Sequence, residues 1–414
     1  MKNIYLLLFF FVYSISFSQT FETSLQLRPR LEFRNGYKNL LFEDQDPATF
    51  ISQRSRLTLG YKNEKLLVKL AAQNIHVWGD VPTMRLKDNN GIALFEAYGQ
   101  YSFNEDFFVR LGRQVLSYDN QRILGEVNWA QQGQSHDAAL LSWQPAENSR
   151  LDLGFAYNAP AETLAEVPYA VNSYQNLQFA WYHLEFGKSG LSLLAMNTGY
   201  EDPADQEVDY LQTFGGFYKF NSRKFAADAS AYGQTGKRLD RDLSAFYAGA
   251  NLNYAISGIW KVGAGAEYLS GTNMDENSGD LNSFTPLFGT NHAFNGFMDY
   301  FYVGNHQNTV GLVDLYGKVT YSAPKFELSV IPHAFSSAAT IIDPSAGEMD
   351  KYLGTEVDLA GSWKVAKDFS VAMGYSQMFA TDSLELLKGG DAGASQNWAW
   401  LMVNFNPTLF SFSK

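Results

Sequence analysis

The chain has 414 residues, of which 46% are hydrophobic, 15% aromatic and 18% charged, and its formal net charge is −12. It contains no cysteine, which excludes a disulfide framework, a Cys-ligated metal site and a thiol nucleophile. The acidic balance argues against a nucleic-acid partner, because such proteins carry a basic face that neutralises phosphates. The charged fraction is also below the roughly 25% of soluble domains.

The N-terminus has the features of a secretory signal peptide. One early lysine is followed by an apolar run over residues 4–13 and by small residues up to Ser18. An uncleaved anchor is the alternative, but this run is about half of the roughly 20 residues that a helical span needs. The sequence therefore predicts a cleaved signal peptide over residues 1–18 and a mature domain over residues 19–414, with no later helical span.

From residue 20 onward the chain alternates between apolar and polar residues. In the first segment, odd positions such as Leu25, Leu27 and Leu31 are apolar, whereas even positions such as Arg28 and Arg30 are polar. A period of two over this length is typical of a β-strand with one apolar and one polar face. Eighteen such strands are predicted, over residues 20–34, 50–61, 65–77, 91–103, 106–117, 134–144, 150–159, 174–186, 191–200, 208–220, 223–234, 241–256, 259–271, 309–322, 325–335, 351–364, 368–380 and 396–406.

The connections between these strands alternate in length. Every second one is tight, as at residues 62–64 and 221–222, and the others are mostly long and polar, as at residues 118–133 and 272–308. This asymmetry is typical of the outer-membrane barrels of Gram-negative bacteria. The predicted fold class is all-β: a transmembrane, antiparallel, up-and-down β-barrel of about 18 strands with short periplasmic turns and long extracellular loops.

A barrel of this size has a water-filled lumen, so the strand number predicts a channel. The polar faces of the first, second and fifth strands carry Arg28, Arg30, Arg54, Arg56 and Arg110. Later strands carry acids on their polar faces, so we expect a lumen with a basic wall and an acidic sector. The alternative is that these charges only pair with their neighbours across the strands.

Two segments carry a resemblance to a known family. The first runs from Arg110-Leu111-Gly112-Arg113-Gln114 through Tyr118-Asp119, Arg122, Gly125 and Asn128-Trp129 to Gln134-Ser135-His136-Asp137. The second is Phe284 to Tyr302, with Leu287-Phe288-Gly289-Thr290-Asn291-His292 and Gly296-Phe297-Met298-Asp299-Tyr300-Phe301. Together they resemble the alginate export family of outer-membrane porins.

The resemblance implies roles for four residues. Arg113 and Arg122 would line a constriction that recognises carboxylate groups, and Trp129 and Asp137 would position the loop that narrows the pore. An arginine suits such a role because its planar fork binds a carboxylate with two hydrogen bonds. Structural alternatives stay open: Arg113 could pair with Asp119 or Asp137, and Trp129 could anchor at the outer interface.

The sequence offers little support for catalysis or metal binding. The six histidines lie in no recognisable nucleophile motif, so we predict that the protein is not an enzyme and needs no cofactor. His292, His306 and Asp299 share the longest loop, which makes a metal site there conceivable. Because that loop, residues 272–308, is rich in phenylalanine, we expect it to fold into the mouth as a constriction or lid.

These observations favour one function over another. We predict a passive outer-membrane channel for anionic solutes, including carboxylate-bearing oligo- or polysaccharides of the kind that alginate export implies. The alternative is a non-conducting barrel that acts as an adhesin or structural protein through its extracellular loops. Expected partners are outer-membrane lipid, an anionic solute and periplasmic export proteins, without nucleic acid, in a monomer or trimer.

Overall fold

The structure is a computed structural model that describes residues 19–84, 90–169, 171, 174–202, 206–238, 240–276, 278–290 and 292–414. The predicted signal peptide, residues 1–18, lies outside the described residues. Among the residues described, no helix is long and apolar enough to cross a membrane.

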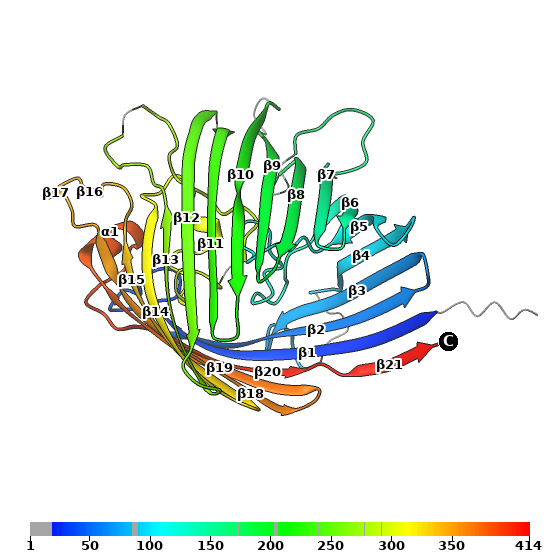
Figure 1. The fold of residues 1–414 in the computed structure, drawn as a ribbon. Coiled ribbons are helices and arrows are strands. Elements are labelled where there is room, and N and C mark those ends of the chain that lie inside the picture. Colours follow the sequence, from blue (N-terminus) through cyan, green and yellow to red (C-terminus); the bar gives the residue numbers. More distant parts are fainter. Residues whose placement is uncertain are drawn as a thin grey trace, which may run out of the picture.

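The described part of the chain forms one closed antiparallel barrel (Figure 1). Each strand of the sheet pairs with the strands before and after it. The sheet closes because β1 (Thr20–Asn35) pairs with β2 (Ala48–Lys62) on one side and with β20 (Gln396–Phe405) and β21 (Thr408–Ser413) on the other. The sheet contains 19 described strands, but β20 and β21 are consecutive parts of one barrel strand, so the barrel has the predicted 18.

The barrel strands, in chain order, are β1 (Thr20–Asn35), β2 (Ala48–Lys62), β3 (Leu66–Val77), β4 (Ala93–Ser102), β5 (Phe107–Gln114), β6 (His136–Ala146), β7 (Ser149–Tyr157), β8 (Asn176–Phe186), β9 (Ser189–Glu201), β10 (Val208–Asn221), β11 (Phe225–Arg238), β12 (Arg241–Ala255), β13 (Trp260–Leu269), β14 (Leu312–Ala323), β15 (Phe326–Ser336), β18 (Tyr352–Ala366), β19 (Phe369–Ala380), β20 (Gln396–Phe405) and β21 (Thr408–Ser413).

The last barrel strand is longer than the sequence predicts. The expected strand ends at residue 406, whereas β21 continues beyond it and pairs with Thr20–Ser24 of β1. Pro407 separates the two parts because a proline has no N–H to give to the ladder. Its carbonyl oxygen still accepts a hydrogen bond from the Leu25 N–H at 3.1 Å, so the seam stays paired across the break.

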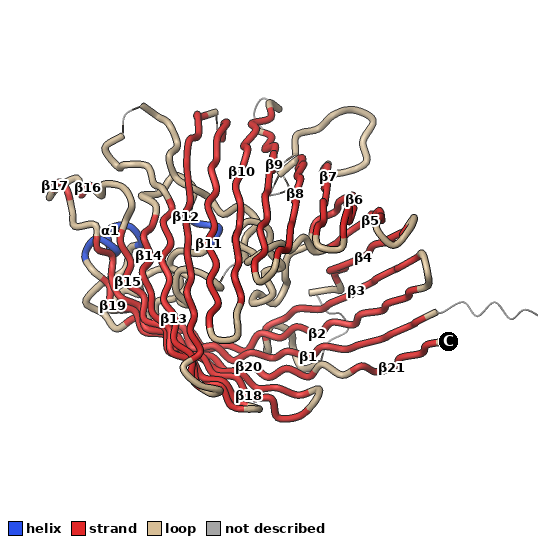
Figure 2. The backbone as a smooth tube through the Cα atoms, viewed as in Figure 1, coloured by secondary structure: helices blue, strands red, loops and turns tan. Residues whose placement is uncertain are grey.

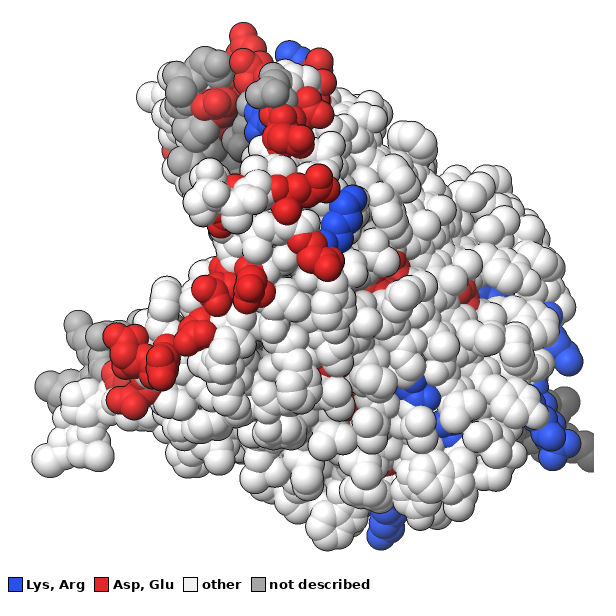
Figure 3. Space-filling view, turned by 90° about the vertical axis from the view of Figure 1, so that its left-hand side faces the viewer, with Lys and Arg blue, Asp and Glu red and all other residues white. Residues whose placement is uncertain are grey.

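The two faces of the strands have the predicted opposite character. On β1, Leu31 keeps 40% of its surface exposed on the outer face, whereas Arg28 and Arg30 each keep 5% on the inner face. The outward apolar residues form a broad uncharged belt, and acidic residues gather beyond it at one end of the barrel (Figure 3). This distribution fits a sheet that meets lipid on its outside and encloses its polar residues.

The asymmetry of the connections is confirmed, with one exception. Turns such as residues 63–65 and 222–224 lie at one end, and the long connections lie at the other (Figure 1). The predicted loop at residues 235–240 is instead mostly strand, because β11 continues to Arg238 and pairs with the start of β12.

Small elements occur in the long connections. They are the 3-10 helix η1 (Val303–Asn305), the hairpin strands β16 (Ile342–Asp343) and β17 (Gly347–Glu348), and the helix α1 (Asp382–Lys388). The sequence predicts α1 only as a loop, because a helix of seven residues is too short to show a helical period. The helix ends at Lys388, and its C-cap residue is Gly389, whose φ of 69° is readily adopted by glycine.

Candidate functional site

Two long connections fold into the lumen and meet there. The first inner loop, residues 115–135, joins β5 to β6, and the second inner loop, residues 270–311, joins β13 to β14; both run inside the barrel (Figure 2). The Gly125 N–H donates to the Phe288 carbonyl at 2.9 Å, and the Phe288 N–H donates to the Ile123 carbonyl at 3.1 Å. The two loops thus form one constriction, and the second loop folds inward as predicted.

Arg122 lies at the centre of this junction. It is 1% exposed, and its guanidinium forms an ion pair with Glu267 of β13 at 2.9 Å. The same group donates a hydrogen bond to the Asn295 side chain of the second inner loop at 2.8 Å. Arg122 therefore lies in the constriction, as the resemblance implies, but its charge is used to join the first loop to the second loop and to the wall.

Three arginines of the predicted basic wall hold the first inner loop. Arg28 donates to the Asn128 carbonyl at 2.8 Å, and Arg54 donates to the Asn128 side-chain oxygen at 2.8 Å. Arg30 donates to the Trp129 carbonyl at 2.7 Å and lies 4.0 Å from the centre of the Trp129 ring. These guanidinium groups supply hydrogen bonds to loop carbonyl oxygens that have no partner in a strand.

Carboxylates of the predicted acidic sector hold the second inner loop. They accept hydrogen bonds from its backbone N–H groups, whereas the arginines donate to carbonyl oxygens of the first inner loop. Asp358 of β18 accepts a hydrogen bond from the Phe297 N–H at 3.1 Å, and Glu356 accepts one from the Met298 N–H at 2.8 Å. Both carboxylates are 0% exposed. The basic and acidic walls are thus two docking surfaces, one for carbonyl oxygens and one for N–H groups.

Trp129 connects the inner loops with the barrel seam. Its ring stacks on His292 of the second loop with the ring centres 4.1 Å apart. It also meets Trp398 and Trp400 of β20 edge-to-face, with centres at 5.6 and 4.9 Å. The structure therefore places Trp129 inside the lumen, where it positions the first loop, and not at the outer interface.

Arg56 and Arg110 are inward residues whose side chains donate hydrogen bonds to neighbouring strands and not to the inner loops. Arg56 donates to the Gln73 side chain at 2.6 Å, and Arg110 donates to the Gln100 side chain at 2.8 Å. Neither forms an ion pair with any residue that the structure describes, and both stay partly exposed. They remain cationic groups of the lumen wall.

The structure corrects the placement of Arg113 and Asp137. These residues are direct partners in the β5–β6 ladder and form a two-point ion pair, with nitrogen–oxygen distances of 3.0 and 2.6 Å. They share the face of Leu111 and Leu141, which are 57% and 39% exposed on the outside of the barrel. Since alternate residues of a strand face opposite sides, Arg113 points away from the lumen, unlike Arg110.

The histidines of the second loop do not gather around a common point. His292 contacts Asp299 at 3.3 Å, whereas His306 donates from its Nε2 to the Phe301 carbonyl at 2.9 Å. Across the described ranges, no three His, Asp or Glu side chains are close enough together to hold a metal ion.

Sequence reasoning missed several residues that build the constriction. Gln131 accepts two hydrogen bonds from Arg28, at 3.1 and 3.0 Å, and donates to the Ser52 hydroxyl at 3.0 Å. Asn295 bridges Arg122 and the acidic wall. Both lie on irregular loops, where no period marks an inward residue, so the sequence carries no signal for them.

The closed barrel of 18 strands, with long loops folded into its lumen, is that of the outer-membrane porin class. The family model for alginate export matches residues 41–395, and the chain belongs to this family.

Solved structures of similar fold include proteins of two bacteria, among them the outer membrane protein OpdK. Pseudomonas aeruginosa OccK9 (OpdG) has a TM-score of 0.64 and 13% identity, covering 94% of this chain and 98% of that one. OpdK from the same organism has a TM-score of 0.63 and 11% identity, with 95% and 99% covered. Acinetobacter baumannii OccAB1 has a TM-score of 0.64 and 12% identity, with 94% and 97% covered. A comparison with curated proteins found no match.

Proposed function

We propose that the protein is a passive outer-membrane channel for anionic solutes, and that carboxylate-bearing saccharides are among them. The observation that carries this proposal is the pair Arg56 and Arg110, inward cations that form no ion pair with any described residue. An arginine on a water-filled wall attracts anions and stays charged at every physiological pH. A second structure of OpdK, aligned at 13% identity, contains vanillate, which is an aromatic carboxylate.

Anion preference can be tested with two arginines of one strand. Arg110→Gln removes an inward charge, whereas Arg113→Gln removes an outward one and serves as the matched control. We expect Arg110→Gln to lower the chloride-over-potassium permeability ratio about two- to fivefold, because an ion at contact distance gains about 1 kcal/mol from one charge in water. Arg113→Gln should leave the ratio unchanged.

The measurement is the reversal potential of purified channels in planar bilayers under a KCl gradient. Equal shifts for both variants would contradict the assignment of Arg110 to the lumen. Absence of conducting steps from folded protein would contradict the channel itself and favour the alternative, a binding barrel that acts through its loops.

Export to the outer membrane requires a signal, and we propose that residues 1–18 supply it. Gln19 is the first described residue, and its backbone exchanges hydrogen bonds of 3.2 and 3.0 Å with Lys414 at the seam. Cleavage after Ser18 leaves this seam intact. We expect the intact mass of protein from outer-membrane fractions to correspond to a chain starting at Gln19, and a mass that includes residues 1–18 would contradict it.

The proposed channel function also implies partner proteins and an oligomeric state. A passive pore transports along the gradient, so the direction of transport depends on the proteins that supply or consume the solute. We therefore propose periplasmic export proteins as partners, and a monomeric or trimeric assembly in outer-membrane lipid.

A further inference from the structure

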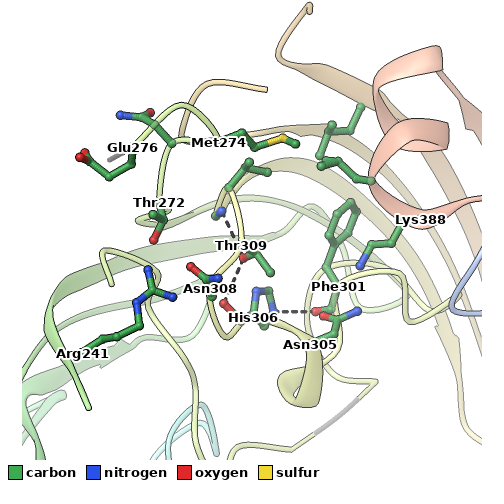
Figure 4. A pocket seen from close by; sticks show the side chains of 15 residues that line it. Arg241, Thr272, Met274, Glu276, Phe301, Asn305, His306, Asn308, Thr309 and Lys388 are labelled. Atoms are coloured by element: carbon green, nitrogen blue, oxygen red, sulfur yellow. Dashed lines mark hydrogen bonds between the residues drawn. The ribbon is translucent and has the colours of Figure 1, made fainter. Parts of the chain in front are cut away.

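A cavity of about 410 Å³ lies at the end of the barrel that carries the long connections, next to helix α1. It is lined by the start of β12, by both ends of the second inner loop and by helix α1 (Figure 4). Its volume is within the range of about 300–1,000 Å³ that is usual for small-molecule sites.

Two cations enter this cavity from opposite sides, Arg241 from β12 and Lys388 from the last turn of α1 (Figure 4). The guanidinium of Arg241 donates only to backbone oxygens, those of Gly279 and Asp280. Lys388 has no hydrogen bond or ion pair with any described residue, and its nitrogen lies 5.4 Å from the Phe301 ring centre. Both charges therefore lack an anionic partner.

Burial makes the positive charge of Lys388 less favourable. Removal of water lowers the pKa of its ammonium group to about 8. A partly buried cation without a counter-ion is unfavourable, and an anion placed beside it would remove that penalty. The cavity thus contains a site where a negative charge is favoured by the surrounding protein.

The neutral groups of the cavity suit a polar organic molecule. Burial lowers the pKa of His306 to about 3, so its ring is neutral, with Nε2–H donating to the Phe301 carbonyl and Nδ1 left as an acceptor. Asn305 and Asn308 add amide groups. Among the described lining residues the only acid is Glu276, so with Arg241 and Lys388 the cavity carries one net positive charge.

We propose that this cavity binds a small organic monocarboxylate, about the size of one sugar acid, with its carboxylate beside Lys388. The net charge of the lining matches one carboxylate, and the amides and the His306 acceptor match hydroxyl groups. The binding follows from the cavity alone. Its role as an entry site for translocation rests on the proposed channel function.

The test is isothermal titration calorimetry of the full-length folded protein in detergent, with glucuronate as the probe and glucose as its uncharged counterpart. We expect saturable binding of glucuronate and much weaker binding of glucose. Lys388→Met should weaken glucuronate binding about tenfold or more, as loss of a charge-assisted contact does. Lys351→Met is the matched control, because Lys351 lies at the same end of the barrel outside the cavity.

The protonation of Lys388 gives a second readout. The charged and titratable groups that share the cavity with it are Arg241, Glu276 and His306. Glucuronate affinity should fall as the pH rises through about 8, because the ammonium then loses its proton. Lys388→Arg should retain binding and remove this pH dependence, since the guanidinium keeps its charge.

Two results would overturn the proposal: equal affinity for glucuronate and glucose, or unchanged glucuronate affinity in Lys388→Met. Bilayer conductance is measured on the same preparations. It tests the channel proposal independently of the carboxylate site, and conducting steps show that a variant has folded. Anion conductance without glucuronate binding would refute only the site. Binding without conductance would refute the channel function and leave the site standing.

Discussion

Replacing Arg122 by methionine is expected to open the constriction. The change removes the cation between the two inner loops and leaves the carboxylate of Glu267, which is 4% exposed, without its ion-pair partner. Loss of one member of a buried pair costs about 3–5 kcal/mol. The barrel ladder does not depend on Arg122, so this cost falls on the junction of the loops, which should separate locally.

The measurement is single-channel conductance, which should rise severalfold in Arg122→Met and become noisier. The double variant Arg122→Met with Glu267→Leu is the control, because replacing both partners by apolar groups removes the uncompensated charge. We expect the double variant to return toward the original conductance. If Arg122→Met conducts like the unaltered protein, the junction does not limit the current.

Adding one methyl group at Gly289 should open the same junction by a different route. A Cβ at this position would lie 2.3 Å from the Arg122 carbonyl oxygen, which belongs to the backbone and cannot turn aside. Overpacking of this kind costs about 1–3 kcal/mol, and the loops can relieve it by moving apart. Gly289→Ala should therefore increase conductance without changing any charge.

Gly258→Ala is the matched control, because a Cβ there would meet nothing within 4 Å. Limited proteolysis provides an independent readout, since a separated inner loop becomes accessible to protease at the mouth. An increase in conductance for Arg122→Met but not for Gly289→Ala would mean that charge, and not the separation of the loops, controls the current.

Much of the barrel could be predicted because lipid imposes period two on every strand. The same rule decides between Arg110 and Arg113, which are three residues apart and must face opposite sides. The lumen role expected for Arg113 came from the family resemblance, and the geometry of the strand overrides it. The apolar content of the second inner loop likewise predicted that it folds inward, because phenylalanines avoid water.

Other features left no local signal. The first inner loop is held by Arg28 and Arg54, which lie 100 and 74 residues from Asn128 in the chain. No period or motif marks such long-range contacts. The period of the strands predicted that these arginines face inward. It did not predict that their guanidinium groups would donate hydrogen bonds to oxygens of the first inner loop. Strand β21 was missed because Pro407 looks like the end of a strand.

The position of Trp129 has a consequence for the order of folding. Its indole contacts Arg30 on the first barrel strand and both Trp398 and Trp400 on the last. These strands are the most distant pair in the chain, and bringing them together carries the largest entropy cost of any pairing in the barrel. A docked Trp129 offers both strands a common surface, so closure of the barrel and entry of the first inner loop are steps that assist each other.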